Sequence, residues 1–69
     1  MTYYIYRRDQ NGFVLQLGWE WTADKAIHVA ENYIKNLLPR YGSFTVEVHA
    51  NGVKSEKIFE QTASGEKVI

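Results

Sequence analysis

The pattern of apolar positions in the first third of the chain predicts a β-hairpin. Residues 2–8 and 13–21 are rich in aromatic and branched apolar side chains, and the polar link 9–12 separates them. The link reads Asp-Gln-Asn-Gly, which fits a type I turn followed by a glycine in the left-handed conformation. This three-residue loop sets Asp9 opposite Phe13.

The three-residue loop also assigns the side chains of the hairpin to two faces. The face expected to be buried carries Tyr3, Ile5, Arg7, Phe13, Leu15, Leu17 and Trp19. The opposite face carries Tyr4, Tyr6, Arg8, Val14, Gln16 and Glu20. A two-residue Asn-Gly loop would instead place Ile5 opposite Gly18 and away from the leucines. The longer loop is preferred because it buries more apolar surface.

The next segment predicts one amphipathic helix over residues 23–37. Thr22 is a suitable N-cap, Asp24 favours the positive end of the helix dipole, and Pro39 ends the pattern. Apolar residues at spacings of three and four form one stripe, which consists of Ala26, Ile27, Ala30, Tyr33, Ile34 and Leu37. We expect this stripe to pack on a sheet through Leu15, Leu17, Phe44 and Val46.

Two further strands are predicted after the helix. Residues 43–49 alternate strictly between apolar and polar side chains, as in a half-buried strand. A two-residue Asn51-Gly52 loop would join them to a strand over 53–59, with Phe44 opposite Phe59 and Ala50 opposite Val53. The last strand carries Lys54, Glu56 and Lys57, and such charges are typical of a sheet edge. Either Ile58 or Phe59 must then face outward.

These elements predict an α+β fold of order β-β-α-β-β, in which one helix packs on one face of a four-stranded, mainly antiparallel sheet. A right-handed crossover gives the strand order 2-1-3-4. The domain is expected to span residues 1–60. Residues 61–69 are expected to form a polar C-terminal tail that could end in a short extra strand at Val68-Ile69.

Composition removes several classes of function. The chain has 69 residues, eight basic and eight acidic side chains, two histidines and no cysteine. Disulfides and thiolate metal sites are therefore impossible, and we expect no metal or cofactor. No apolar run approaches the roughly 20 residues of a membrane helix, and no signal-peptide pattern is visible, so we expect a cytoplasmic protein. A chain this short rarely holds both a core and a ligand pocket of roughly 300–1,000 Å³, so no enzyme activity or small-molecule substrate is expected.

The sheet face that the helix leaves uncovered is the candidate binding surface. Ten aromatic residues exceed the needs of so small a core, and aromatic side chains are enriched at protein interfaces. The candidate binding residues are Tyr4, Tyr6, Arg8, Gln16, Glu47, His49 and Trp21. Trp21 is expected to be an exposed anchor and Trp19 to be buried at the end of the core. Tyrosines also occur on sheets through strand propensity alone.

Two other clusters have ordinary structural explanations. Asp24, His28 and Glu31 share one helical face, but exposed charges at such spacings are common on helices. Glu47 and His49 resemble a base with an orienting carboxylate, but the sequence fixes no nucleophile beside them.

The sequence therefore predicts a small, non-catalytic protein-binding or regulatory module that uses its open sheet face. Its partner would be another protein or a second copy of itself. The alternative is a single-stranded nucleic-acid-binding protein in which Tyr4 and Tyr6 stack on bases and Arg7, Arg8 and Arg40 contact phosphate. Zero net charge and nearby glutamates argue against this alternative and against a membrane surface.

Overall fold

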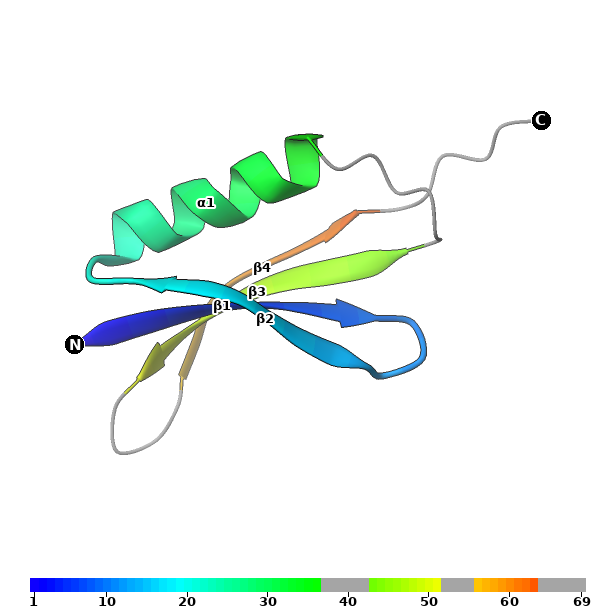
Figure 1. The fold of residues 1–69 in the computed structure, drawn as a ribbon, viewed down its shortest axis with the longest axis horizontal. Helices are drawn as coiled ribbons and strands as arrows, with labels where there is room; N and C mark the ends of the chain where they lie inside the picture. The colour runs from blue at the N-terminus through cyan, green and yellow to red at the C-terminus, as the bar shows by residue number, and fades with distance from the viewer. Residues whose placement is uncertain (37–42, 52–55, 64–69) are drawn as a thin grey trace.

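The computed structural model describes residues 1–36, 43–51 and 56–63. Its elements, in chain order, are β1 (Thr2–Asp9), β2 (Val14–Glu20), α1 (Ala23–Asn36), β3 (Phe44–Asn51) and β4 (Glu56–Ala63). All neighbouring strands are antiparallel, and the sheet order is β2-β1-β3-β4 (Figure 1). The α+β class and the strand order predicted from the sequence are confirmed.

The first hairpin turn has the predicted geometry. Gly12 has φ of 88°, a left-handed conformation that glycine adopts without steric cost. The amide of Asp9 donates to the carbonyl of Phe13 at 2.9 Å, and the amide of Gly12 donates to the carbonyl of Asp9 at 3.0 Å. The Asp9 side chain accepts two further bonds from the amides of Asn11 and Phe13. These bonds fix the start of the β1–β2 register.

A β-bulge then changes that register in the middle of the hairpin. Tyr6 pairs with Gln16, but Ile5 pairs with Gly18, so Leu17 is an extra residue on β2. Leu17 still packs against the core. Beyond the bulge every side chain of β2 lies on the face opposite to the one predicted.

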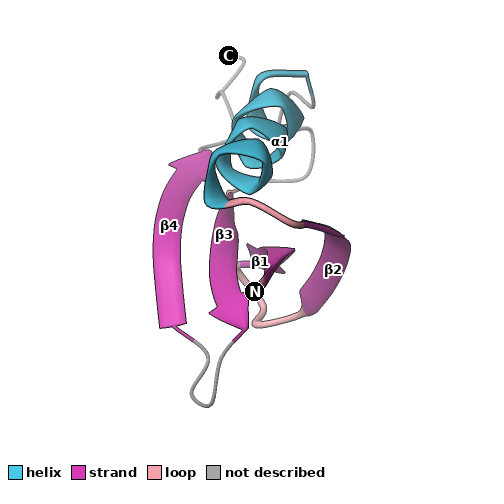
Figure 2. Ribbon diagram, turned by 90° about the vertical axis from the view of Figure 1, so that its left-hand side faces the viewer, coloured by secondary structure: helices cyan, strands magenta, loops and turns pink. Residues whose placement is uncertain are grey.

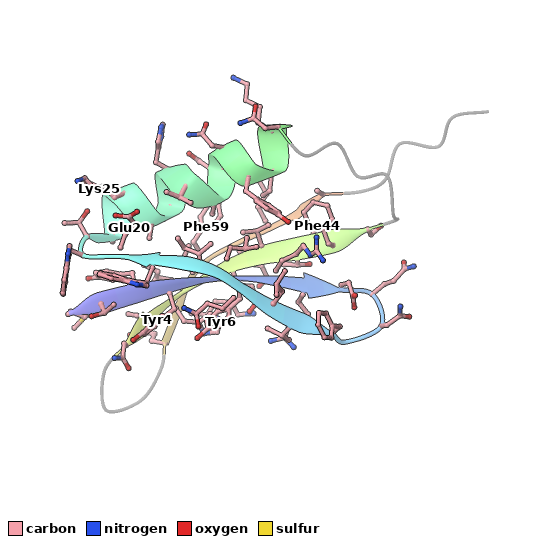
Figure 3. All side chains as sticks on the ribbon, viewed as in Figure 1. Tyr4, Tyr6, Glu20, Lys25, Phe44 and Phe59 are labelled. Atoms are coloured by element: carbon pink, nitrogen blue, oxygen red, sulfur yellow. The ribbon has the colours of Figure 1, made fainter. Side chains whose placement is uncertain are left out.

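Because of the bulge, Trp19 and Glu20 lie on the faces opposite to those predicted from the sequence. Trp19 pairs with Tyr4 on the uncovered face and is 47% exposed, so its predicted burial is wrong. Glu20 pairs with Tyr3 and lies on the helix side, as Figure 3 shows, and not beside Tyr4 and Tyr6. The turn residues could not reveal this shift because it occurs several residues away from the turn.

The helix begins as the sequence predicts. The amide of Lys25 donates to the Thr22 hydroxyl at 3.3 Å, and the amide of Ala26 donates to the Thr22 carbonyl at 3.1 Å. Ala26 and Ala30 are fully buried and allow the helix backbone to approach the sheet closely. Leu37, predicted as the last residue of the helix and of its apolar stripe, lies outside the described residues.

The core lies between α1 and the centre of the sheet. Its buried members are Ile5, Ala26, Ala30, Phe44, Val46, Val48 and Ala63. Tyr3, Leu17, Ile27, Tyr33, Ile34 and Phe59 pack against them while partly exposed. The predicted role of Leu15 in the core is wrong, because this side chain is 42% exposed. The helix packs mainly on β3 and β1, and Figure 2 shows β2 at the edge of the sheet, to one side of α1.

The second hairpin has a different register from the predicted one. Phe44 pairs with Ala63 and Ala50 with Glu56, so the predicted pairs with Phe59 and Val53 are wrong, and Phe59 pairs with Val48 instead. Residues 61–63 belong to β4 and not to a tail, because this register places Ala63 in the core. A second irregularity leaves Ile58 between the Val48–Phe59 and His49–Lys57 pairs. Val53, Lys54 and residues 64–69 lie outside the described residues.

Candidate binding face

The side of the sheet opposite α1 is called the open face. Figure 3 shows Tyr4 and Tyr6 on this side, whereas Phe44 and Phe59 lie between sheet and helix. Strand pairing brings side chains from all four strands to the open face, and those of β1, β2 and β3 form its centre and its β2 side. They are Thr2, Tyr4, Tyr6 and Arg8 of β1, Val14, Gln16 and Trp19 of β2, and Thr45, Glu47 and His49 of β3.

A series of aromatic side chains crosses the open face and is called the aromatic row. The ring centroids of Trp21 and Trp19 are 4.9 Å apart in an edge-to-face arrangement. Trp19 pairs across the strands with Tyr4, whose ring centroid is 6.4 Å from that of Tyr6. Tyr6 meets the His49 ring edge-to-face at 5.3 Å. The tryptophan pair and the Tyr6–His49 pair have the edge-to-face geometry that aromatic pairs favour, whereas the Tyr4 and Tyr6 rings are tilted by 34°.

A shallow hollow of about 440 Å³ lies at the tryptophan end of the aromatic row. Its walls are Thr2, Tyr4, Gln16, Trp19 and Trp21. None of these five side chains is charged, and Gln16 and Thr2 supply an amide and a hydroxyl among the rings. The hollow therefore suits an apolar group flanked by a polar backbone.

At the other end of the row, Glu47 is buried at only 2% exposure. Arg8 donates from Nε to its Oε2 at 3.0 Å, and His49 Nε2 lies 2.8 Å from its Oε1. Burial alone would raise the pKa of Glu47, but the hydrogen bonds from Arg8 and His49 and the charges of Arg8 and Lys57 lower it. The same hydrogen bond and charge of Glu47 raise the pKa of Arg8. Glu47 is thus held as a carboxylate with both oxygens occupied.

The β4 side of the open face is also internally paired. Lys57 Nζ lies 2.9 Å from Glu60 Oε1, and this hydrogen bond raises the pKa of Lys57. The hydroxyls of Thr45 and Thr62 are 3.1 Å apart. A partner of this face therefore meets charges that already have partners within the chain.

All seven residues proposed from the sequence lie on the open face or in its hollow. Sequence reasoning missed Trp19 and Thr2. The spacing of two between Trp19 and Trp21 was the available signal, since it puts both indoles on one face whenever the strand continues to Trp21. Arg7 lies on the helix side, where its Nη1 donates to the Tyr33 hydroxyl at 3.1 Å and its guanidinium stands 5.8 Å from the centre of the Phe44 ring.

Comparison of the chain with protein-family models, curated proteins and solved structures found no match. Within the described residues, no group of three or more histidine, aspartate or glutamate side chains is arranged to hold a metal ion. In the same part of the chain, no helix has the length and apolar character needed to cross a membrane. The geometry of the open face is therefore the basis for a functional proposal.

Proposed function

We propose that this protein is a non-catalytic protein-binding module whose open face holds an extended, uncharged segment of a partner protein. The observation that carries the proposal is the aromatic row, with Trp19 47% and Trp21 68% exposed beside an uncharged hollow. Aromatic side chains give large contact areas and lose few rotamers on binding, so they are frequent anchors at interfaces.

The chemistry of the face favours an uncharged segment. Arg8 and His49 are both hydrogen-bonded to Glu47, and a charged ligand would have to compete with these contacts. Grooves lined by tyrosine and tryptophan bind extended, proline-rich segments, whose backbone conformation is already formed before binding. Gln16 and Thr2 are positioned in the hollow to meet the carbonyls and amides of such a segment.

The arrangement of Glu47 and His49 supports a binding role more than a catalytic one. A general base needs an oxygen free to take a proton from a substrate. Both oxygens of Glu47 are engaged within the chain, and the carboxylate is buried.

The single-stranded nucleic-acid alternative retains one supporting observation, which is the stacking surface of Tyr4 and Tyr6. Its phosphate contacts have less support. Arg7 lies on the opposite side of the sheet, and Arg8 is engaged by Glu47. Arg40 lies outside the described residues.

Intrinsic tryptophan fluorescence offers a direct test, because both tryptophans of the chain line the hollow. A set of uncharged, extended peptides, including proline-rich ones, would be titrated into wild-type protein and into a Tyr4→Ala, Tyr6→Ala double variant. We expect saturable binding to wild type and a loss of about 2 kcal/mol, or roughly 30-fold in affinity, in the double variant.

The matched control is Lys35→Ala on the exposed side of α1, which should bind as wild type does. Circular dichroism of the double variant should show an intact fold, because neither tyrosine belongs to the core beneath α1. Normal peptide binding by the double variant, or no binding by wild type to any uncharged peptide, would contradict the proposal.

A further inference from the structure

The exposed large apolar side chains concentrate in β2 and the residues that directly flank it. Of eight such residues in the described part of the chain, five lie between positions 13 and 21. They are Phe13, Val14, Leu15, Trp19 and Trp21. By contrast, the large apolar side chains most deeply buried in the core are Ile5, Phe44, Val46 and Val48, on the central strands β1 and β3. The β2 edge therefore carries most of the large apolar side chains that the described residues leave exposed.

These residues lie on both faces of β2. Val14 and Trp19 lie on the open face, whereas Leu15 lies on the helix side, opposite Arg7. Phe13 is 60% exposed at the start of the strand. Figure 2 shows that α1 does not cover this edge. A strand that is apolar on both faces is typical of the interior of a sheet and not of its edge.

The two edges of the sheet differ in charge. From Val14 to Trp19, β2 contains no charged residue, whereas β4 carries Glu56, Lys57 and Glu60. Charged side chains are the usual protection of an edge strand against pairing with another chain. The β4 edge has that protection and the β2 edge lacks it.

The backbone of β2 is also oriented for a further strand. The carbonyl of Phe13 accepts from Asp9, so it points toward β1. Because backbone groups alternate in direction along an antiparallel strand, those of Val14 and Gln16 point outward from the sheet. Leu15 is therefore flanked by two residues, Val14 and Gln16, whose backbone amides and carbonyls point away from β1.

We propose that β2 pairs antiparallel with β2 of a second copy of this chain, around a two-fold axis at Leu15. The uncharged stretch from Val14 to Trp19 pairs best with a stretch of the same kind, and of the two edge strands described only β2 contains one of this length. The axis places the two copies of Leu15 opposite each other and pairs Val14 with Gln16 of the second copy. Each pair then shares one face of the sheet.

Apolar side chains at the β2 edge contribute to the area that such a dimer buries. The exposed part of Phe13 amounts to roughly 90–150 Å², since a ring residue offers about 150–250 Å². A stable interface buries about 800 Å² per partner. The edge backbone, Val14 and Leu15 add to the ring area.

This inference goes beyond the proposed function, because it concerns the edge of the sheet and not the recognition of a different protein. The two-fold axis is perpendicular to the sheet. Pairing of the two β2 strands therefore joins two four-stranded sheets into one continuous sheet. Both open faces then lie on the same side, with their tryptophans near the junction.

The first test is sedimentation velocity of wild type, Leu15→Lys and Ile58→Lys across a dilution series. Leu15→Lys places two ammonium groups opposite each other at the axis and should raise the dimer dissociation constant at least about tenfold. Ile58 is a matched control, because it is an aliphatic residue of similar exposure on the β4 edge. Ile58→Lys should dimerise as wild type does.

A second measurement is independent of any loss of folding in the lysine variant. The chain has no cysteine, so Leu15→Cys introduces a single thiol. Residues opposite each other in a non-hydrogen-bonded antiparallel pair have Cα atoms about 4.5 Å apart, which a disulfide can span. With oxidised glutathione as the oxidant, Leu15→Cys should form a covalent dimer much faster than Ile58→Cys.

A wild-type protein that remains monomeric up to about 1 mM would overturn the proposal. Equal dimerisation of the two lysine variants, or equal crosslinking of the two cysteine variants, would also overturn it. The Tyr4→Ala, Tyr6→Ala variant should dimerise as wild type does, which separates this test from that of the proposed function.

Discussion

At the scale of single residues, Glu47 shows how a neutral chain places a charge inside a sheet. A buried carboxylate is costly unless hydrogen bonds and an opposite charge compensate for it. Arg8 and His49 supply this compensation from the same face, at 3.0 and 2.8 Å. Glu47 thereby fixes the positions of two open-face side chains, one of which is the last ring of the aromatic row.

The lowered pKa of Glu47 predicts a specific acid sensitivity. A carboxylate whose pKa is lower in the folded than in the unfolded state stabilises the fold above its ordinary pKa of 4.5. That contribution is lost as the pH falls through the lowered pKa. We expect Glu47→Gln to reduce the free energy of unfolding at pH 7 by about 1–3 kcal/mol, and the difference from wild type to shrink below pH 4.5.

Urea denaturation between pH 2 and pH 7 measures this effect. The control is Glu60→Gln, which faces Glu47 across the β3–β4 pair but is exposed and bonded only to Lys57 among the contacts described. The free energy of unfolding of Glu60→Gln should stay within about 1 kcal/mol of the wild-type value at every pH, as for exposed ion pairs. Parallel stability curves for Glu47→Gln and wild type over the acid range would contradict the assignment.

At the scale of elements, the four strands differ in how much each contributes to stability. Ile5 of β1 lies at the centre of the sheet and is 1% exposed, while Ile58 lies in the irregular part of β4 and is 36% exposed. The central strands β1 and β3 hold most of the buried side chains, and α1 adds two alanines. Loss of a central side chain should therefore be far more destabilising than loss of the same side chain at the edge.

The pair Ile5→Ala and Ile58→Ala tests this difference with identical chemistry. Ile5→Ala should cost about 2–5 kcal/mol, because it leaves a cavity beneath α1 that the small core fills poorly. Ile58→Ala should cost less than about 1 kcal/mol. Equal losses in chemical denaturation would show that the described core is incorrectly placed.

At the scale of the whole molecule, the balance of charge limits the partners of the open face. The chain carries eight basic and eight acidic residues, and on the open face Arg8 and Lys57 form ion pairs while His49 hydrogen-bonds to Glu47. Binding to a polyanion gains free energy from the release of counterions by free cationic groups. The open face offers few such groups in its described part.

We therefore expect no salt-sensitive binding of single-stranded oligonucleotides at physiological ionic strength. A fluorescence titration with labelled DNA and RNA oligonucleotides, repeated at several salt concentrations, would measure it. Micromolar affinity that falls steeply with added salt would favour the nucleic-acid alternative and assign Tyr4 and Tyr6 to base stacking.

The sequence by itself determined the features that depend on neighbouring residues. The link 9–12 determined the first turn, and Thr22 determined the start of the helix. The spacing of apolar residues determined which side of α1 is buried. Strict alternation assigned Glu47 and His49 to the open face, and short connections with a right-handed crossover determined the strand order. These signals also placed Tyr4, Tyr6 and Arg8 on the open face, because these residues precede the turn that sets their register.

Only the tertiary structure decided what depends on packing between distant segments. The bulge at Leu17 exchanges Trp19 and Glu20 between the faces, and the β3–β4 register extends β4 to Ala63. The position of α1 over β1 and β3 leaves Leu15 exposed. A one-residue shift in a strand costs little locally but moves every later side chain to the other face. Its outcome therefore depends on the total surface buried by the whole sheet and helix, which no local pattern records.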